Sequence, residues 1–397
     1  MRDPLTSPGP TLGVVGGGQL GRMLAEAASP LGVELVVLDP TPDCPAATGS
    51  RDQIVGNFDD AKRIYELASR VDALTFEIEL ADPDVLEGAG EEYGIPVHPS
   101  PETLRTIQDK LVQKRHLQEN GIPVPRFRAV SDADDVRAAM DEFGAPVMLK
   151  ARRGGYDGRG NVPVERPDDA ESALSAVTGG ERQGPEAMVE AFVEFERELS
   201  VIGVKGDGEI ATYVAGENVH EEEILRETVV PARASEAVRE RAQSAAREVL
   251  ELLEGRGTYG IELFETPDGD VLVNEIAPRP HNSGHWTIEG ARVSQFEQHV
   301  RAVLGWPLGS TELRDPAVSA NLLGDVEDSQ PASLHGVEEL LAAPDAHLHW
   351  YGKREARPLR KMGHLTVVSG GADDDRSREE LLESARTYRD RTTFRTP

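Results

Sequence analysis

"TYGIELFETPDGDVLVNEIAPR", residues 258–279, contains two apolar runs on either side of "TPDGD". An Asp-Gly pair between such runs is typical of a β-hairpin, so we expect two adjacent antiparallel strands. Glu262 lies in the first run and Glu275 in the second. Neighbouring strands can bring two carboxylates to one face, where they repel each other unless a divalent cation separates them. Because oxygen ligands suit Mg²⁺, the pair predicts a magnesium site, the alternative being unrelated glutamates on opposite faces.

Bulk composition bounds the class of protein. The chain has 397 residues, of which 38% are hydrophobic and 28% charged, so we expect two or three globular domains. It has no apolar run as long as a membrane helix, and the N-terminal "MRDPLTSPGPT" lacks an apolar signal region. We therefore expect a cytoplasmic protein that has no membrane partner. The only cysteine, Cys44, excludes an internal disulfide and a cysteine-rich metal site.

The chain is strongly acidic. Its formal net charge at pH 7 is −29, and acidic residues occur throughout, as in "HEEEIL" and "GGADDDRSREELLE". Such a surface keeps a protein soluble where salt screens charge, which indicates a halophilic source; an acidic protein of an ordinary cell is the alternative. Nucleic acid is not an expected partner, because a phosphate backbone needs a basic face. Since the chain has only seven lysines, a lysine inside a motif points to chemistry.

The order of predicted elements divides the chain into three domains. "TLGVVGGG", "VELVVLD" and "DALTFEIE" are predicted strands that alternate with helices, which is typical of a doubly wound parallel sheet over residues 1–105. A helix is predicted over residues 106–120, ended by Gly121. Residues 106–315 then have an α+β pattern, and residues 316–397 are expected to form a small, separate C-terminal domain. The expected fold class is therefore α/β together with α+β.

A glycine motif follows the first predicted strand. Gly16, Gly18 and Gly21 form G-x-G-x-x-G, and Asp39 ends the next strand. A nicotinamide-dependent dehydrogenase has this arrangement, in which the acid binds ribose. The motif is weak, however, since any strand–glycine–helix turn presents amide groups to a phosphate. A phosphate site of unspecified origin, assisted by Arg22, and a tight turn without a ligand both stay open.

Two lysines and a second glycine loop are the parts that phosphoryl transfer requires. Lys150 ends an apolar strand and is followed by "RRGGYDGRGN", a loop of the kind that folds over phosphates. Lys110 lies early in its predicted helix, and the chain has no Walker-type motif. Together with a carboxylate pair that binds metal, these groups would neutralise and position the phosphates of ATP.

Six segments give the chain a resemblance to a known family. In order they are "DKLVQK", "GIPVP", "VMLKARRGGYDGRGN", "VEAFVEFERELS", "GIELF" and "NEIAPRPHNSGHWT". The chain resembles the ATP-grasp superfamily and, within it, the 5-(carboxyamino)imidazole ribonucleotide synthetases of purine biosynthesis. The resemblance spans nearly the whole chain and includes "GGGQLGRM", "FEIE" and "YGKREARPLRKMGH". It implies an ATP-grasp fold at residues 106–315, with a lid subdomain at about residues 125–195.

The resemblance implies an ATP-dependent carbon–nitrogen ligase. Its reaction would join bicarbonate to 5-aminoimidazole ribonucleotide through carboxyphosphate and release ADP and phosphate. It also implies a homodimer that uses Mg²⁺, held by Glu262 and Glu275. The positions that match the family's ATP site are Lys110, Lys150, Gly155, Tyr156, Asp157, Gly158, Arg159, Gly160, Asn161, Glu190, Ala191, Phe192, Val193, Glu198, His220, Asn274 and Glu275.

Within this set, the resemblance implies separate tasks. The two lysines would contact phosphates, residues 155–161 would form the lid, and residues 190–193 would offer their main chain to adenine. Glu198 would bind the ribose. Many members of the superfamily have an asparagine ligand two residues after the second glutamate. That position is Ala277 here, so water or phosphate would complete the metal shell.

"APRPHNSGH", residues 277–285, would line the place where phosphate, bicarbonate and ribonucleotide meet. Its two prolines restrict the backbone, so neighbouring side chains would be held in fixed directions. The resemblance implies a catalytic set of Arg279, which would hold bicarbonate, His281 and Lys353. His281 and His285 have i, i+4 spacing without an H-E-x-x-H motif, so we prefer a structural histidine to a zinc ligand at His285.

The ribonucleotide is expected between the first glycine loop and the basic segment "YGKREARPLRKMGH". An alternative for the basic segment is a solvated edge that balances local acidic charge. The residues that the resemblance assigns to the ribonucleotide are Gly18, Gln19, Leu20, Glu77, Lys353, Arg360 and Lys361.

Three other functions stay open. The formate-using ATP-grasp transformylase of the same pathway has a similar "NE…PRPH" stretch, but its lid is normally rich in serine, unlike "GGYDGRG". A Rossmann dehydrogenase would bind NAD in place of ATP. A non-catalytic nucleotide-binding protein would tolerate the loss of Glu275.

Overall fold

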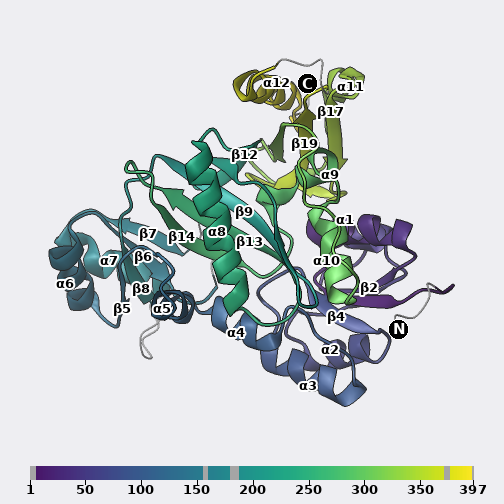
Figure 1. Ribbon diagram of the computed structural model, residues 1–397, viewed down its shortest axis with the longest axis horizontal. Coiled ribbons are helices and arrows are strands. Elements are labelled where there is room, and N and C mark those ends of the chain that lie inside the picture. The colour runs from purple at the N-terminus through teal and green to yellow at the C-terminus, as the bar shows by residue number, and fades with distance from the viewer. Residues whose placement is uncertain (1–5, 155–159, 179–186, 371–375, 396–397) are drawn as a thin grey trace.

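The computed structural model describes residues 6–154, 160–178, 187–370 and 376–395, and Figure 1 shows how its elements are arranged. The N-terminal sheet has the parallel strand order β3-β2-β1-β4. Apolar side chains are buried on both of its faces, which is typical of a sheet covered by helices on either side. The predicted doubly wound parallel sheet is therefore confirmed. Its elements are β1 (Thr11–Val15), α1 (Gln19–Ala28), β2 (Glu34–Asp39), β3 (Asp52–Val55), α2 (Ala61–Ala68), β4 (Ala73–Phe76) and α3 (Pro83–Tyr93).

The helix expected over residues 106–120 is interrupted. The structure has α4 (Pro101–Gln108) and α5 (Lys110–Glu119), and Asp109 between them has an extended backbone with φ −107° and ψ 101°. Asp109 caps α5, because its side chain accepts hydrogen bonds from the main-chain N–H groups of Leu111 and Val112. The prediction of one continuous helix is wrong, although the end before Gly121, whose φ is 78°, is confirmed.

A smaller sheet follows, with the antiparallel order β5-β8-β6-β7. Helices α6 (Ala133–Phe143) and α7 (Ala170–Thr178) pack on it through a core that includes Val136, Ala139 and Ala173. This unit occupies the segment in which the lid subdomain is predicted, and in Figure 1 it projects to one side of the molecule. Its strands are β5 (Phe127–Val130), β6 (Val147–Ala151), β7 (Asn161–Val164) and β8 (Ala187–Ala191).

The largest sheet follows the path β14-β13-β9-β11-β12-β15-β19-β17, with β10 paired to β9. Helix α8 (Glu236–Leu252) packs on it through a core that includes Leu199, Ala242 and Val249. The strands are β9 (Arg197–Lys205), β10 (Ile210–Thr212), β11 (Gly216–Glu221), β12 (Ile224–Val230), β13 (Gly257–Glu265), β14 (Val271–Ala277), β15 (Ala317–Leu323), β17 (Ala346–Trp350) and β19 (Lys361–Val368).

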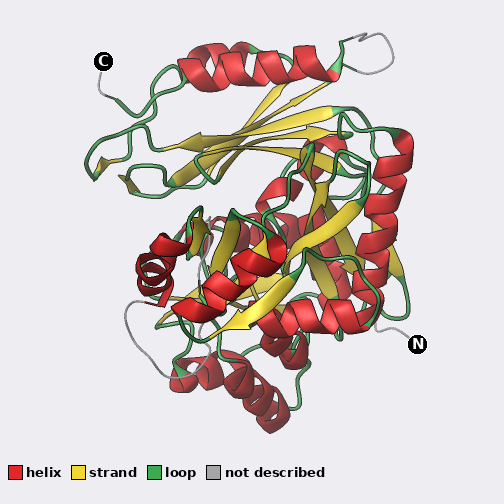
Figure 2. Cartoon of the chain, turned by 90° about the vertical axis from the view of Figure 1, so that its left-hand side faces the viewer, coloured by secondary structure: helices red, strands yellow, loops and turns green. Residues whose placement is uncertain are grey.

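The long C-terminal strands extend the large sheet, whereas the short strands at Gln330–Pro331 and Glu355–Ala356 pair only with each other. β15 pairs with β12, because an edge strand left without a partner would expose its main-chain groups. The segment 316–397 therefore shares a sheet with the strands before it, and the domain boundaries at residues 105 and 315 stay a prediction. Helix α12 (Arg378–Arg391) lies over these strands, as Figure 2 shows. The remaining elements are α9 (Thr287–Gly290), α10 (Gln295–Val303), β16 (Gln330–Pro331), α11 (Val337–Ala342) and β18 (Glu355–Ala356).

The part of the chain that the structure describes holds no helix with the length and apolar character that crossing a membrane requires.

Candidate active site

The strands β13 and β14 form the predicted hairpin, and its two glutamates lie directly opposite each other. The antiparallel register pairs Glu262 with Glu275, and a β-bulge follows Glu262. Opposite residues of an antiparallel ladder project from the same face, so the two carboxylates share one side of the sheet, as predicted. The Glu262 side chain is 25% exposed and the Glu275 side chain 45%. The pair is therefore accessible to a ligand.

Two lysines reach this hairpin from different elements. Lys110, the first residue of α5, places its Nζ 2.6 Å from Oε1 of Glu275. Lys150, on β6 of the smaller sheet, donates to Oδ1 of Asn274 over 3.2 Å. Three parts of the chain that are distant in sequence thus bring together the lysines and the glutamates expected in one site.

The two carboxylates differ in their electrostatic surroundings. Desolvation, assisted by the charge of Glu275, raises the pKa of Glu262 to about 7. Desolvation would also raise the pKa of Glu275, but the charge and hydrogen bond of Lys110, together with the charges of Lys150 and His281, outweigh it and lower that pKa. Desolvation would lower the pKa of Lys110, but the charge and hydrogen bond of Glu275, together with nearby glutamates, outweigh it and raise that pKa. Glu262 is therefore the carboxylate whose ionised form would be stabilised most by a bound cation.

The residues present fit a divalent cation. Within the described ranges, no group of three or more His, Cys, Asp or Glu side chains is arranged to hold a metal ion. A cation at Glu262 and Glu275 would take its other ligands from phosphate or water, which is how Mg²⁺ is usually bound in nucleotide sites.

Glu198 on β9 and His220 on β11 extend the site along the large sheet. Nδ1 of His220 lies 2.8 Å from Oε2 of Glu198. Burial alone would lower the pKa of His220, but the carboxylates of Glu198 and Glu262 outweigh it and raise that pKa. The two residues expected at the nucleotide are thus in contact with each other and within electrostatic reach of the glutamate pair.

The predicted lid is described only in part. Gly160 and Asn161 lead into β7, where Asn161 pairs with Lys150 in the ladder between β6 and β7. The end of the lid segment therefore lies beside a lysine that is expected to bind phosphate. The other predicted lid residues lie outside the described residues; they are Gly155, Tyr156, Asp157, Gly158 and Arg159.

Residues 190–193 begin at the end of β8 in the smaller sheet and lead toward β9. Phe192 is 45% exposed, whereas Glu190 is only 3% exposed. The main-chain N–H of Ala191 donates to the carbonyl of Arg126. Only a main-chain role is predicted for this segment, but the side chain of Glu190 also contacts the site: its Oε2 lies 2.7 Å from Nζ of Lys150.

The loop after β14 brings Arg279 and His281 to the same region. Nε of Arg279 lies 2.9 Å from Oε1 of Glu79, the last residue of "FEIE". Nε2 of His281 lies 3.7 Å from Oε1 of Glu262, and its Nδ1 lies 2.8 Å from Oγ of Ser283. The guanidinium is thus held by Glu79, and the imidazole lies close to Glu262 of the glutamate pair.

Two further residues of the site, Gln295 and Glu79, are not among the predicted ones. Gln295 is fully buried at the start of α10 and binds the main chain of His281: its Oε1 accepts from the N–H over 2.8 Å and its Nε2 donates to the carbonyl over 2.7 Å. No motif marks a glutamine at the start of a helix. Glu79 lies in "FEIE", two residues after Glu77, which is predicted to bind the ribonucleotide. This short distance in sequence is the only feature that could have indicated Glu79.

His285 lies at the buried end of a stack of three imidazole rings. It is 1% exposed and stacks on His364, which stacks on His349, with ring centroids 4.5 and 4.4 Å apart. The hydroxyl oxygen of Tyr351 lies 3.3 Å from Nδ1 of His285 and 2.9 Å from Nδ1 of His364. Burial lowers the pKa of both His285 and His364 well below the usual value. The stack fits the structural interpretation of His285 better than a zinc ligand.

Carboxylates of this chain accept hydrogen bonds from the main-chain N–H groups of the first glycine loop. The N–H of Gly17 donates to Oδ2 of Asp39 over 3.0 Å, and the N–H groups of Gly18 and Gly21 donate to the Glu77 carboxylate. Because these N–H groups already have acceptors, the contacts contradict a phosphate site on the amide groups. Asp39 accepts a hydrogen bond from the protein's own main chain, so it is not available to bind the ribose of a dinucleotide. Desolvation raises the pKa of Glu77 to about 7.

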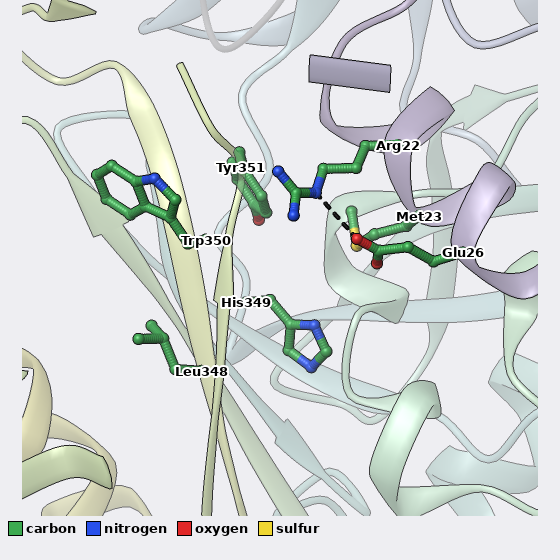
Figure 3. A pocket seen from close by; sticks show the side chains of 7 residues that line it. All are labelled: Arg22, Met23, Glu26, Leu348, His349, Trp350 and Tyr351. Carbon is green, nitrogen blue, oxygen red and sulfur yellow. Dashed lines mark hydrogen bonds and ion pairs between the residues drawn. The ribbon is translucent and has the colours of Figure 1, made fainter. Parts of the chain in front are cut away.

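The first helix and the basic segment face each other. A small open pocket of about 90 Å³ separates α1 from the end of β17, and Figure 3 shows the side chains of Arg22 and Tyr351 on its two sides. Arg22 is paired with Glu26 over 2.9 Å. Lys353, two residues beyond Tyr351, donates to the carbonyl of Lys361 over 2.6 Å. The two regions expected to hold the ribonucleotide are therefore adjacent.

The basic residues of this segment have different surroundings. The charge of Lys361 acts to lower the pKa of both Glu262 and His220, so this lysine lies near the glutamate pair. Arg360 donates to the main-chain carbonyl of Glu355 over 2.9 Å. Arg354, by contrast, pairs with Asp43, and both side chains are 75% exposed. The solvated-edge interpretation thus fits Arg354 and does not fit Lys361.

A parallel N-terminal sheet, a small antiparallel sheet that carries a lysine, and a large sheet that carries two opposed glutamates define an ATP-grasp enzyme. Comparison with known families agrees. Residues 10–108 match the ribonucleotide synthetase preATP-grasp domain, residues 115–296 the ATP-grasp domain, and residues 317–379 the phosphoribosylaminoimidazole carboxylase C-terminal domain.

Similar individual proteins show to which family of ATP-grasp enzymes the chain is related. N5-carboxyaminoimidazole ribonucleotide synthase of Brucella melitensis is 42% identical over 91% of this chain and 97% of its own. The crystal structure of N5-carboxyaminoimidazole ribonucleotide synthetase from Thermotoga maritima is 43% identical, with a TM-score of 0.84 over 97% of this chain and 99% of that chain. N5-carboxyaminoimidazole synthase from Aspergillus clavatus, in complex with ADP and 5-aminoimidazole ribonucleotide, is 35% identical, with a TM-score of 0.85 over 96% of this chain and 97% of that one. The chain belongs to the N5-carboxyaminoimidazole ribonucleotide synthase family, as the sequence resemblance predicts.

Proposed function

We propose that this protein carboxylates 5-aminoimidazole ribonucleotide in purine biosynthesis. Bicarbonate, ATP and the ribonucleotide would give 5-(carboxyamino)imidazole ribonucleotide, ADP and phosphate. The observation that carries the proposal is the meeting of the opposed glutamates with a lysine and a histidine: Glu275 lies 2.6 Å from Lys110, and Glu262 lies 3.7 Å from His281. Membership of the synthase family supports the same reaction.

ATP would bind between the smaller sheet and the large sheet. Lys110 and Lys150 would contact its phosphates, because both ammonium groups already lie at the hairpin residues 274 and 275. The main chain of residues 190–193 would contact adenine, and Glu198 with His220 would contact the ribose. The lid at residues 155–161 would exclude water from the phosphates.

Mg²⁺ would be held by Glu262 and Glu275. When bound, it would neutralise phosphate charge and polarise the transferring phosphoryl group. Asn274 adjoins this pair and accepts a hydrogen bond from Lys150. The lysines are needed in addition, because carboxylates alone would repel a triphosphate.

Arg279 and His281 would receive bicarbonate. One bicarbonate oxygen attacks the γ-phosphorus, so that ADP leaves and carboxyphosphate forms. Its C–O bond then breaks to give CO₂ and phosphate, and the amine of the ribonucleotide attacks CO₂ and loses a proton. Arg279 is held by Glu79 and the main chain of His281 by Gln295, so both groups are oriented before substrate binds.

The ribonucleotide would lie between α1 and the basic segment. Its phosphate would contact Lys353, Arg360 and Lys361, which follow β17. Support comes from the pocket in Figure 3, where α1 and the residues around Tyr351 face each other. On the side of α1 the contacts would come from Gly18, Gln19, Leu20 and Glu77.

The protein would act as a homodimer in a salt-rich cytoplasm. The net charge of −29 supports a halophilic setting, since such a surface stays hydrated when salt screens charge. The chain would divide into three domains at residues 105 and 315.

Phosphate release in concentrated KCl tests the proposed reaction, with bicarbonate and the aminoimidazole ribonucleotide each omitted in turn. Dependence on both is the expected result. Turnover that needs formate would indicate a transformylase, NAD binding without ATP binding would indicate a dehydrogenase, and ATP binding without any turnover would indicate a non-catalytic protein.

A further inference from the structure

A buried network of three charged side chains lies behind the nucleotide site. Lys114 is 2% exposed and Glu190 is 3% exposed. The two oxygens of the Glu190 carboxylate are shared between two lysines: Oε1 lies 3.1 Å from Nζ of Lys114, and Oε2 lies 2.7 Å from Nζ of Lys150. Lys150 also donates to Asn274, so Glu190 and Asn274 together set the direction of its ammonium group.

Lys114 connects three elements that each carry a residue of the nucleotide site. It lies one helical turn after Lys110 on α5, and its Nζ donates to the carbonyl of Val273 on β14 over 3.1 Å. Val273 directly precedes Asn274 in the hairpin. Glu190 belongs to β8 in the smaller sheet. The buried ammonium therefore joins the smaller sheet to the large sheet at the edge of the nucleotide site.

The charges of this network depend on one another. Burial lowers the pKa of Lys114 to about 8, although the Glu190 charge opposes this. Burial would raise the pKa of Glu190, but the two lysines outweigh it and lower that pKa to about 2. Glu190 therefore stays ionised, and removal of either lysine would leave its charge only half compensated.

We propose that Lys114 is a positioning residue for ATP. By holding one oxygen of Glu190, it leaves Lys150 a single oxygen and keeps that lysine directed toward the hairpin, where the phosphates bind. Without Lys114, both oxygens of Glu190 compete for Lys150 and draw it away from the phosphates. This inference rests on the proposed function, because it assumes that Lys150 contacts ATP.

Lys114→Met tests the proposal, since it removes the charge and keeps most of the length. We expect the KM for ATP to rise at least about tenfold, while the KM for the ribonucleotide stays within about twofold. Lys114→Arg, which keeps the charge, should stay close to the wild type. Lys205→Met is the matched control: Lys205 also donates to a main-chain carbonyl, that of Leu250 over 2.8 Å, and it lies at the far end of β9.

A combination of variants separates positioning from a purely structural ion pair. Because Lys114 acts through Glu190, Lys114→Met combined with Glu190→Gln should have the same KM for ATP as Glu190→Gln alone. This comparison also applies if Lys114→Met does not fold, since the double variant removes the Glu190 carboxylate that Lys114→Met leaves half compensated, and Lys150 still donates to Asn274. A lower melting temperature with an unchanged KM for ATP, an equal rise in both KM values, or a double variant that differs more than about threefold from Glu190→Gln would each overturn the proposal.

Direct binding of ADP to each variant gives a readout that needs no turnover. A weaker affinity for ADP in Lys114→Met than in Lys205→Met supports the positioning role, and equal affinities contradict it. If the wild type binds ADP but does not consume bicarbonate, the proposed reaction fails while the role of Lys114 in nucleotide binding is still decided by this comparison.

Discussion

Glu262 of β13 lies directly opposite Glu275 of β14, and the ammonium of Lys110 lies 2.6 Å from Glu275. Two carboxylates in opposite positions destabilise a hairpin, so stability does not explain the pair. The proposed shared cation would explain it. In the absence of such a cation, Lys110 neutralises one carboxylate, and the other keeps a raised pKa of about 7.

Glu262→Gln and Glu275→Gln should each lower kcat/KM for ATP by about 100-fold, because each removes a charged ligand that the transferring phosphate depends on. The Mg²⁺ concentration for half-maximal phosphate release should rise in both variants. Asp268→Asn, in the exposed turn of the same hairpin, is the control and should change neither quantity. Wild-type rates in Glu262→Gln at every Mg²⁺ concentration would rule out this metal site.

Glu79→Gln should weaken the hold on Arg279, to which Glu79 is paired over 2.9 Å. We expect the KM for bicarbonate to rise about tenfold, since the guanidinium loses its fixed direction, and the KM for ATP to stay within about twofold. Glu102→Gln is a suitable control, because it removes an exposed partner of another arginine, Arg105. A rise in the KM for ATP without a change for bicarbonate would place Arg279 elsewhere in the reaction.

Glu77→Ala should raise the KM for the ribonucleotide about tenfold, because the carboxylate orders the start of α1, where Gln19 and Leu20 lie. The variant also frees the N–H groups of Gly18 and Gly21 at the start of α1. Inorganic phosphate should then inhibit in competition with the ribonucleotide, since free amide groups at a helix N-terminus attract anions. Glu91→Ala, at an exposed position of α3, should behave as the wild type. An unchanged KM together with no phosphate inhibition would show that this loop is remote from the substrate.

His299 should make stability depend on pH. Its Nδ1 accepts from the N–H of Thr258 over 3.1 Å and its Nε2 lies 2.8 Å from Oγ1 of Thr75, so the ring is neutral with its proton on Nε2. Burial lowers its pKa to about 3. The unfolded chain, with an ordinary histidine pKa of about 6.5, therefore takes up the proton first, and stability is lost as the pH falls from about 6.5 toward 3.

Comparison of the wild type with His299→Gln isolates this group from the other titrating residues. For each pH unit below about 6.5, the wild type should lose about 1.4 kcal/mol of its free energy of unfolding relative to His299→Gln. Urea denaturation in concentrated KCl over about pH 4 to 8 measures it. A difference that is constant with pH would mean that His299 is not held neutral.

Local chemistry made part of the fold predictable. The strand Thr11–Val15 is an unbroken apolar run, and the hairpin at Gly257–Ala277 is centred on an Asp-Gly turn. The break at Asp109 was not predictable, because its neighbours favour helix and its partner Arg152, 3.0 Å away, is distant in sequence. The pairing of β15 with β12 has the same cause: an edge strand selects its partner in three dimensions.

The same distinction applies to the site. Glu262 and Glu275 were predictable as opposite residues, because the hairpin pairs them directly. The contacts of Glu79, Gln295 and Lys114 were not, because each joins elements that only the tertiary structure brings together. In this chain, the residues expected to contact the substrates lie in recognisable sequence motifs. The residues that hold those side chains in place do not.

In the proposed reaction, ATP activates bicarbonate by phosphoryl transfer at this site. Bicarbonate labelled with ¹⁸O, supplied with ATP and the ribonucleotide in a reaction too brief for exchange with water, tests it most directly when the released phosphate is examined by mass spectrometry. Transfer of one labelled oxygen to each phosphate is the predicted result, because the attacking oxygen stays on phosphorus when carboxyphosphate breaks down. Full formation of the carboxylated product with unlabelled phosphate would contradict the claim.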